Sequence, residues 1–282
     1  MGPERSGGAA PVQTGTQDRE ASHSGEAGSP AEQGKFVKSA RLVLLSCNIH
    51  KGFATGNRTF TLHRLADALR SAQPDVAFLQ EVQGEHAHHA AKHAGWPLAG
   101  QAAMLAQRLD ADHAYGANAK YTHGHHGNAI VSKQPLLGWK NHDVSNHRFE
   151  RRGLLHARIQ LNGRIVHLVC CHLDLTKWGR ERQVERLARL VREDVPADEP
   201  LAVAGDFNDW RGHTDLADAG LVEAHHHLHG RHARTFPAFW PRLSLDRIYL
   251  RGLRPVSCGT LANAPWPSIS DHVPLRCEVE LA

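Results

Sequence analysis

The sequence predicts a mixed α/β protein in which two β-sheets pack face to face, with helices on the outside. Eight apolar runs of strand length recur along the chain, several of them rich in Val and Ile and bounded by Gly, Pro, Asn or Asp. They cover residues 42–47, 76–79, 129–131, 154–159, 165–172, 201–204, 245–250 and 273–279. From about residue 129 to 172 these runs follow one another without a helix, as hairpins do, which favours stacked sheets over a doubly wound parallel sheet.

Three segments carry the apolar spacing of amphipathic helices. The first lies within residues 62–69 and must end before Pro74, because a proline disfavours helix at the residue that precedes it. The second lies within residues 184–191 and is surrounded by arginines, and a third, less regular one covers residues 102–109. The chain has no internal repeat and no second shift of composition, so we expect one domain over residues 39–282.

Residues 1–38 differ from the rest in composition, with Gly, Ala, Ser, Glu and Gln dominating. Such a segment buries too little apolar surface to offset its ordering entropy, so we expect a disordered N-terminal tail. It lacks the apolar core of a signal peptide. No run along the chain approaches the roughly 18 apolar residues that span a bilayer, so we expect no stable membrane insertion.

The overall composition narrows the class of protein. With 41% hydrophobic and 22% charged residues, the chain is typical of a globular protein. The net charge of +4 mildly favours an anionic partner but is far below that of a dedicated nucleic-acid binder. The 23 histidines gather near residues 86–89, 123–126 and 225–229, and we interpret these clusters as solvated loops rather than metal sites.

The five cysteines indicate a reducing compartment. Their number is odd, no CxxC occurs, and each of them lies in an apolar, strand-like run. Adjacent Cys170 and Cys171 should point to opposite faces of one strand. We therefore expect five buried thiols and a cytoplasmic location.

Polar residues at the ends of apolar runs are the most informative feature of the sequence. One acid at a strand end is usually a turn former, but repeated occurrence of only Asn, Asp, Glu and His at such ends is hard to assign to turns. Strand ends can present reactive groups on a rigid scaffold, whereas strand interiors are occupied by packing. The residues are Asn48, Glu81, His172, Asp206, Asn208, Asp246, Asp271 and His272.

These residue types suit a divalent cation combined with acid–base chemistry. Mg²⁺ prefers carboxylate and carbonyl oxygens, and Mn²⁺ accepts the same ligands. Histidine can activate an attacking water near neutral pH. The sequence has no HExxH or Cys/His zinc spacing, no GxSxG nucleophile turn and no P-loop. We therefore expect Mg²⁺, with Mn²⁺ as an alternative, rather than zinc or a serine nucleophile.

Six short motifs resemble those of the endonuclease/exonuclease/phosphatase superfamily, in the family's order and over residues 41–281. They are SCNIH at Asn48, QEV at Glu81, CHL at His172, GDFND at Asp206, LDRIY at Asp246 and SDHVP at Asp271. The resemblance implies a four-layer α/β sandwich with two central mixed, mainly antiparallel β-sheets flanked by helices. It also implies metal-dependent hydrolysis of phosphate esters.

The resemblance assigns the metal ligands. Glu81 would be the principal Mg²⁺ ligand, with Asn48 nearby and Asp271 as a further ligand. A catalytically inert binding module of the same fold would have lost the base, the metal carboxylate or the phosphate-binding asparagine. The motifs retain all three.

The resemblance also implies catalytic roles. His272 would be the general base, and Asp246 would orient it. Asp206 would position the nucleophile or protonate the leaving group. Asn208 and His172 would bind and polarise the scissile phosphate as its charge grows in the transition state.

Residues beside the motifs are candidates for substrate binding. Arg151 and Arg152 could place a guanidinium at the phosphate, because arginine matches phosphate oxygens in a bidentate way, although a solvated turn is equally compatible. Asn128 lies in a Gly-Asn-Ala-Ile-Val-Ser segment that resembles one of the family and could face the site.

Two tryptophans near the motifs, Trp178 and Trp210, could stack on a base or a lipid group, but we favour buried anchoring for both. Lys177, Arg180 and Arg182 could form a rim for phosphate, but we favour the polar face of the helix that follows.

The substrate stays open between two classes. The motif set is similar to that of a small bacterial branch of the family, some of whose members are encoded beside phospholipid-synthesis enzymes. A phospholipid or inositol-type phosphate ester is therefore an alternative to nucleic acid. The sequence does not indicate the oligomeric state.

Overall fold

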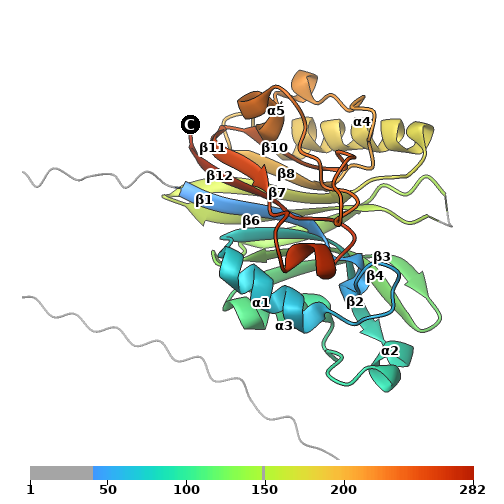
Figure 1. Ribbon diagram of the computed structural model, residues 1–282. Coiled ribbons are helices and arrows are strands. Elements are labelled where there is room, and N and C mark those ends of the chain that lie inside the picture. The colour runs from blue at the N-terminus through green and yellow to red at the C-terminus, as the bar shows by residue number, and fades with distance from the viewer. Residues whose placement is uncertain (1–40, 148–149) are drawn as a thin grey trace, which may run out of the picture. The chain divides into compact units, whose positions relative to one another are not determined.

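The computed structural model describes residues 41–147 and 150–282, which form two six-stranded β-sheets packed face to face (Figure 1). The first sheet has the order β11 (Leu253–Thr260), β12 (Leu275–Leu281), β1 (Arg41–Asn48), β2 (Val76–His86), β4 (Gly124–Ser132) and β3 (Asp112–Tyr121). The second has the order β5 (Gly138–Asp143), β6 (Gly153–Leu161), β7 (Arg164–His172), β8 (Leu201–Asp206), β10 (Asp246–Arg251) and β9 (Val222–Glu223). The predicted pair of stacked sheets is confirmed.

Each sheet contains one parallel pair of strands, and a helix joins the two members of each pair. α1 (Leu62–Ala72) connects β1 to β2, and α4 (Lys177–Asp194) connects β7 to β8. The other pairings are antiparallel, so both sheets are mixed and mainly antiparallel, as predicted. The remaining helical segments are α2 (Ala87–Lys92), α3 (Gln101–Leu109), α5 (Ala224–His229) and the 3₁₀ turns η1 (His50–Gly52), η2 (Ala217–Ala219) and η3 (Trp266–Ser268).

Three apolar layers hold the sandwich together. Along β1, Leu44 belongs to the core between the sheets, whereas Leu45 and Cys47 belong to the core beneath α1 and α3. On β7, Cys170 lies between the sheets and Cys171 lies beneath α4, so the predicted opposite orientation of these thiols is confirmed. All five cysteines are free and buried, as expected.

The four strands that the sequence did not predict, β3, β5, β9 and β11, are the edges of the two sheets. An edge strand is covered by fewer neighbours, so its sequence needs fewer apolar residues. β5, for example, reads GWKNHD, without the apolar alternation that marks the inner strands. The prediction for the second strand, residues 76–79, was too short, because β2 continues to His86.

The histidine clusters lie mainly on regular elements, so their interpretation as solvated loops was wrong. Residues 225–229 belong to α5, residues 124–126 begin β4, and residues 86–89 span the end of β2 and the start of α2. The predicted tail, residues 1–38, and its boundary lie outside the described residues. Among the described residues, no helix is long and apolar enough to cross a membrane.

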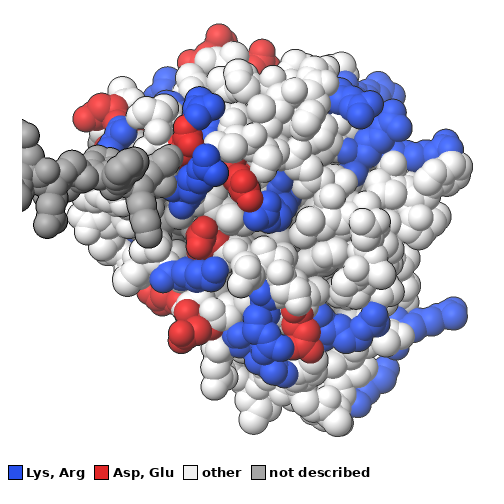
Figure 2. Space-filling model, turned by 60° about the vertical axis from the view of Figure 1, so that its left-hand side comes forward, with Lys and Arg blue, Asp and Glu red and all other residues white. Residues whose placement is uncertain are grey.

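Figure 2 shows Lys and Arg interspersed with Asp and Glu on the face where the described chain begins. Arg41 lies 3.6 Å from Glu280, and Arg276 lies 3.0 Å from Glu278 on β12. Exposed pairs of this kind contribute about 0–1 kcal/mol each, so they add little to the stability of the sheet.

Candidate active site

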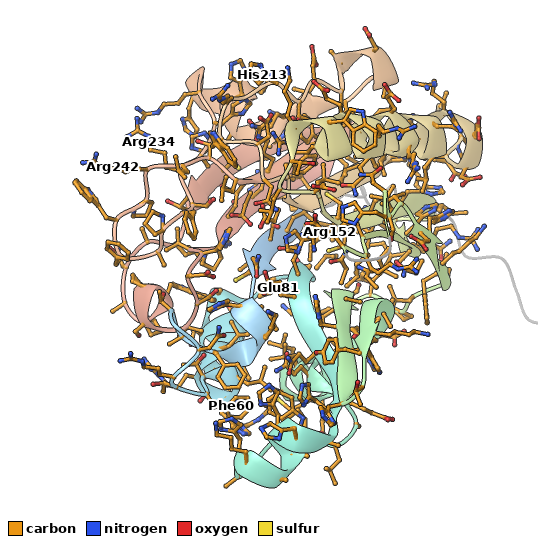
Figure 3. All side chains as sticks on the ribbon, turned by 90° about the vertical axis from the view of Figure 1, so that its right-hand side faces the viewer. Phe60, Glu81, Arg152, His213, Arg234 and Arg242 are labelled. Carbon is orange, nitrogen blue, oxygen red and sulfur yellow. The ribbon has the colours of Figure 1, made fainter. Side chains whose placement is uncertain are left out.

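The ends of the two parallel pairs meet at one end of the sandwich and bring the strand-end residues together. Asn48 is the last residue of β1, His172 the last of β7 and Asp206 the last of β8. Asp246 begins the antiparallel strand β10 and lies opposite Asp206 in the register, while His172 lies beside Asp206 on its other side. Figure 3 looks onto this end of the molecule, with Glu81 near its centre.

A buried series of acids and imidazoles lies on the side of the second sheet. His272 Nδ1 is 2.8 Å from Asp246 Oδ2, and His272 Nε2 is 3.8 Å from Asp206 Oδ2. His172 Nε2 approaches the same Asp206 oxygen to 3.5 Å. The backbone amide of Asp246 donates to Thr235 Oγ1 at 3.2 Å, which fixes the start of β10. The carboxylate of Asp206 is therefore placed between two histidine rings.

Burial governs the protonation of this series. The pKa of Asp206 is raised to about 7, mainly because the carboxylate is buried. The charge of His272 lowers this pKa, whereas the charge of Asp246 raises it further. Burial opposes a charge on His272, but its contact with Asp246 and the nearby Asp206 and Asp271 raise its pKa to about 10. Burial, with a smaller contribution from Arg152, holds the pKa of His172 well below its usual value. A charged His272 and a neutral His172 therefore flank Asp206.

Glu81 lies on the side of the first sheet, at a β-bulge rather than at a strand end as predicted. The register of β2 against β4 shifts between Leu79 and Val82, and Glu81 has a left-handed φ of 57°. A residue in a bulge is left out of the ladder, and here the Glu81 side chain lies beside Asn48 and Lys51 while the strand continues. Asn48 Nδ2 lies 3.3 Å from Glu81 Oε1 and 3.2 Å from Asp206 Oδ2, and so links the two sides.

Asp271 and His272 lie in a bend before the last strand, which begins only at Leu275, so the prediction that they open that strand was wrong. The bend is held by Ser270, whose Oγ donates to the Asn48 carbonyl at 2.7 Å. Asp271 Oδ2 lies 3.8 Å from His50 Nε2. The bend thus brings both residues to the end of β1 although they are more than 200 residues away in the chain.

The donors on this side fit a hard divalent cation. Glu81 and Asp271 each keep about a fifth of their side chain exposed, so a hydrated ion can reach both carboxylates. Asn48 is the third candidate ligand, although its amide oxygen accepts from the His50 backbone N–H at 3.0 Å and its amide nitrogen faces Glu81. Two carboxylates and one amide from separate segments are a donor set typical of Mg²⁺ sites that retain several waters.

A second group of possible ligands lies beside Arg152 and does not include Glu81, Asn48 or Asp271. It consists of one possible ligand atom from each of His147, Glu150 and Asp174, and these three atoms lie within 4.8 Å of one another. Glu150 Oε1 already accepts from Arg152 at 2.6 Å, and Asp174 accepts from the backbone and hydroxyl of Thr176. We therefore attribute this group to the structure of the loops around β6 and α4.

The predicted phosphate-binding asparagines are both engaged by the backbone. Asn208 has a left-handed φ of 52°, its N–H donates to Asp206 Oδ1 at 2.9 Å, and its Nδ2 donates to the Leu173 carbonyl at 2.9 Å. Asn208 therefore fixes the orientation of Asp206. Asn128 is buried within β4, and its Nδ2 donates to the carbonyls of Gly153 and Cys170, at 2.9 and 3.3 Å, in the other sheet. The geometry thus gives Asn128 a role in holding the sheets together.

The two candidate arginines diverge. Arg152 is largely buried, and its charge lowers the pKa of both His172 and His126, which places it beside the site. Arg151 is exposed and lies 3.4 Å from Asp143 at the end of β5. Only Arg152 is therefore brought into the cleft.

Lys51 and His126 belong to the site although no role was predicted for them. Lys51 Nζ lies 3.8 Å from Glu81 Oε2, and burial followed by the charge of Lys51 lowers the pKa of His126 to about 4. Lys51 follows the Asn48 motif by three positions, and His126 shares a strand face with Asn128. These spacings are the sequence signals that could have identified them.

The prediction that both tryptophans are buried anchors was wrong: Trp178 and Trp210 are exposed. Arg180, predicted on the polar face of α4, is instead buried, and its Nη1 donates to the carbonyls of Asp174 and Leu175. Lys177 and Arg182 do lie on the exposed face of the helix.

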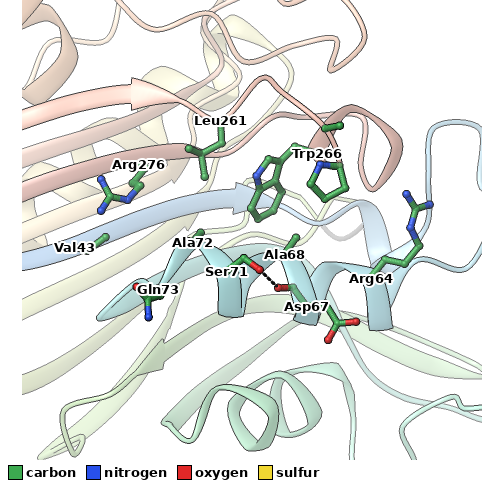
Figure 4. A pocket seen from close by; sticks show the side chains of 12 residues that line it. Val43, Arg64, Asp67, Ala68, Ser71, Ala72, Gln73, Leu261, Trp266 and Arg276 are labelled. Carbon is green, nitrogen blue, oxygen red and sulfur yellow. Dashed lines mark hydrogen bonds between the residues drawn. The ribbon is translucent and has the colours of Figure 1, made fainter.

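A cavity of about 750 Å³ lies outside this site, between α1 and the loop that leads to η3 (Figure 4). Arg64, Ala68, Leu261 and Trp266 are among the residues that line it, and Ser71 Oγ donates to the Asp67 carbonyl at its edge. The cavity brings no carboxylate and histidine together, so the chemistry lies at the strand ends instead.

Comparison with known proteins agrees with this geometry. Residues 45–272 match the endonuclease/exonuclease/phosphatase family. The uncharacterized protein YbhP of Escherichia coli K12 is 43% identical over 243 residues, which cover 84% of this chain and 96% of YbhP. An endonuclease/exonuclease/phosphatase of Beutenbergia cavernae has a TM-score of 0.66 at 21% identity, over 86% of this chain and 72% of that one.

The fold is also similar to that of D. rerio TDP2 complexed with a single-stranded DNA product, with a TM-score of 0.63 at 21% identity over 86% of this chain and 99% of that chain. At this identity the likeness concerns the fold. The family match and the long alignment with YbhP, by contrast, cover nearly all of the sandwich and the strand ends that carry the site. The chain therefore belongs to the endonuclease/exonuclease/phosphatase family.

Proposed function

We propose that the chain is a Mg²⁺-dependent phosphoesterase that hydrolyses a phosphodiester by attack of a water molecule. One observation carries this proposal: Asn48 joins the Asp206 end of the buried acid–imidazole series to Glu81 within hydrogen-bond distances. A histidine oriented by a carboxylate, next to oxygen ligands for a cation, is the combination that metal-assisted hydrolysis requires.

In this proposal His272 is the general base and Asp246 orients it through the 2.8 Å contact at Nδ1. His272 accepts a proton from the attacking water, and the nearby carboxylates of Asp246 and Asp206, which raise the pKa of His272, stabilise the protonated ring that forms. Asp206 then either positions the water or returns the proton to the leaving oxygen.

In this proposal His172 and the guanidinium of Arg152 bind the phosphate. Asn208 donates its amide nitrogen to the Leu173 carbonyl and its backbone N–H to Asp206 Oδ1, so it supports the site by orienting Asp206. Arg151 lies further out and would contact only a substrate that extends beyond the cleft. Asn128 supports the site by holding β4 against β6 and β7.

Glu81, Asn48 and Asp271 would hold the cation, and Mn²⁺ could replace Mg²⁺ at the same donors. A bound divalent cation supplies Lewis-acid stabilisation of the charge that develops on the phosphate oxygens. Lys51, close to Glu81, would neutralise part of the same charge.

Two substrate classes remain compatible with this site: nucleic acid, and phospholipid or inositol phosphate esters. TDP2, whose fold is similar, is a protein complexed with a single-stranded DNA product, which supports the first class. The modest net charge of +4 supports the second, because nucleic-acid binding depends strongly on basic residues. The cytoplasmic location stays a prediction from the cysteines.

The test is a panel of substrates: plasmid DNA, abasic duplex, bis-p-nitrophenyl phosphate, sphingomyelin and inositol phosphates, each with Mg²⁺, Mn²⁺ or EDTA. Wild type is compared with His272→Ala, and with His227→Ala on α5 as a matched histidine outside the site. We expect metal-dependent turnover that only His272→Ala abolishes. Full metal-dependent activity of His272→Ala would overturn the catalytic assignment, and no turnover with any metal would support an inert binding module.

A further inference from the structure

Large exposed apolar side chains concentrate in three loops around the site. Among the residues that the structure describes, eleven large apolar side chains are exposed, and six of these lie in three segments, at residues 207–214, 235–245 and 173–178, the last of which includes the start of α4. These six are 37–72% exposed, and we call them the apolar rim: Leu175, Trp178, Trp210, Phe239, Trp240 and Leu243. Single exposed apolar residues are normal, whereas a concentration on one side of a protein marks an interaction surface.

The three loops adjoin neighbouring strands of the second sheet, at the same end of these strands. The first follows β7, the second follows β8, which is parallel to β7, and the third leads into β10, which is antiparallel to β8. All three therefore leave the sheet at the end where His172, Asp206 and Asp246 lie. The apolar rim and the site share this end of the sandwich.

Each tryptophan of the apolar rim lies close to an arginine. The guanidinium carbon of Arg182 is 4.5 Å from the ring centre of Trp178, and that of Arg242 is 3.3 Å from Trp240. Arg180 is 5.6 Å from the ring of Trp210. Arg234 joins Arg242 on the same side of the site in Figure 3. Arg182, Arg234 and Arg242 are exposed whereas Arg180 is buried, so the surface combines apolar side chains with three exposed cations.

The loops of the apolar rim contact the catalytic residues directly. The ring of Phe236 lies 4.9 Å from that of His272, and the Ala238 N–H donates to the Asp271 carbonyl at 2.7 Å. In the first loop the Leu173 N–H donates to the Asp206 carbonyl at 2.8 Å. A partner that rests on the apolar rim therefore places its own phosphates next to the proposed catalytic residues.

We propose that the apolar rim docks onto an anionic phospholipid bilayer, so that the site acts on the phosphodiester of a lipid headgroup. Tryptophan and arginine side by side suit the headgroup region, where an apolar ring and a cation both find partners. Leu175, Phe239 and Leu243 would reach the acyl boundary, as the apolar face of a peripheral protein does. This inference rests on the proposed function and names its substrate class.

Two features favour a bilayer over single-stranded nucleic acid. Nucleic-acid platforms use aromatic faces on which bases stack, but Leu175 and Leu243 have no such face. The net charge of +4 is also modest for a chain that would bind a polyanion. Both features suit contact with lipid instead.

The experiment measures co-sedimentation of the full chain with vesicles at low salt. One set of vesicles is phosphatidylcholine with 30–40% phosphatidylglycerol, roughly the anionic content at which cationic side chains gain surface attraction, and the other is pure phosphatidylcholine. The test variant is Trp178→Ser combined with Phe239→Ser and Trp240→Ser. The matched control is Trp139→Ser combined with Leu98→Ser, exposed residues outside the three loops. All substituted side chains are exposed, so folding should be retained.

We expect binding to the anionic vesicles that the rim variant weakens about tenfold or more and the control leaves unchanged. His272→Ala should bind like wild type, because docking does not need the base. Failure of wild type to bind anionic vesicles overturns the inference, as does equal loss in the control. Binding of a single-stranded oligonucleotide that the rim variant abolishes, without vesicle binding, assigns the surface to nucleic acid and also overturns it.

Vesicle binding and turnover separate the two proposals. If wild type binds anionic vesicles through the apolar rim but hydrolyses no phosphodiester with any metal, the proposed function fails and the docking surface stands. If it hydrolyses a soluble diester but does not bind vesicles, the docking surface fails and the proposed function stands.

Discussion

The two sides of the site differ in their access to water. On the side of the first sheet, Glu81, Asp271 and Lys51 keep between about a fifth and two fifths of their side chains exposed. On the side of the second sheet, Asp206 and Asp246 are buried. Exposed carboxylates can exchange a hydrated cation, whereas buried acids interact strongly with their neighbours because the local dielectric is low. The proposed cation ligands therefore lie on the side that water can reach, and the proposed proton-transfer groups lie on the buried side.

The difference arises from how each side is positioned. A bulge presents Glu81 from the middle of β2, close to the turn that carries Lys51. Regular strand ends present His172 and Asp206, and the pairing of β8 with β10 sets Asp246 beside them under the loops of the apolar rim. The contrast predicts that the two sides respond differently to substitution and to added metal.

The largest effect is expected for Asp206→Asn on the buried side. The amide keeps the shape of the side chain but cannot exchange a proton with His272, so turnover of a phosphodiester should fall about 10³-fold, within the range for loss of acid–base catalysis. Steady-state rates at rising Mg²⁺ check this, and added metal should not restore the rate. Activity within tenfold of wild type, with unchanged circular dichroism, would contradict the role of the buried side.

Loss of the buried guanidinium of Arg247, beneath the apolar rim, should strongly lower the free energy of unfolding. Arg247 is fully buried, and its Nη2 donates to the Asp209 carbonyl at 2.7 Å and lies 3.3 Å from Asp209 Oδ2. Arg247→Met leaves the buried Asp209 carboxylate without this partner, so the free energy of unfolding should fall by about 3–5 kcal/mol. Urea unfolding measures it. Arg254→Met, which removes an exposed pair with Glu280, is the control and should cost about 0–1 kcal/mol; equal effects would refute the assignment.

A smaller and reversible effect is expected on the exposed side. Glu81→Gln removes the charge of the principal ligand, so the Mg²⁺ concentration for half-maximal rate should rise about 10–100-fold, the range reported for perturbed metal sites. High Mg²⁺ should restore much of the rate, in contrast to Asp206→Asn. Metal titrations of the two variants in parallel provide the measurement, and an unchanged midpoint for Glu81→Gln would argue that Glu81 is not a ligand.

The smallest effect concerns pH and stability at the outer face of the second sheet. Burial, followed by the charges of His167 and His142, lowers the pKa of His156 to about 4. Because the folded pKa lies below the unfolded value, the unfolded chain binds more protons between about pH 6.5 and 4, and stability falls as the pH drops through this window.

His156→Gln should therefore reduce the loss of unfolding free energy between pH 7 and pH 5, measured by urea unfolding at both values. His227→Gln on α5, an exposed histidine, is the control. An equal pH dependence of wild type and His156→Gln would show that other groups account for it.

The inner strands and the crossover helices could be predicted from the sequence. The inner strands are covered on both faces of the sheet, and each crossover helix packs one apolar face against a sheet. Leu44 and Leu45 both lie in apolar cores, so β1 reads as a continuous apolar run. The strand-end residues Asn48, His172 and Asp206 were visible for a related reason, since a polar residue stands out after such a run. Edge strands such as β3 lack this contrast, because solvent covers much of their surface.

The sequence by itself determined which residues are candidates for the site, because Asn, Asp, Glu and His follow or interrupt apolar runs in the order of the family motifs. Only the tertiary structure decided which side of the site each of them occupies. The bulge at Glu81, the approach of Lys51 and the separation of Arg151 from Arg152 depend on contacts between distant segments. The exposure of Trp178 and Trp210 does as well, because burial is a property of what packs against a side chain and not of the side chain alone.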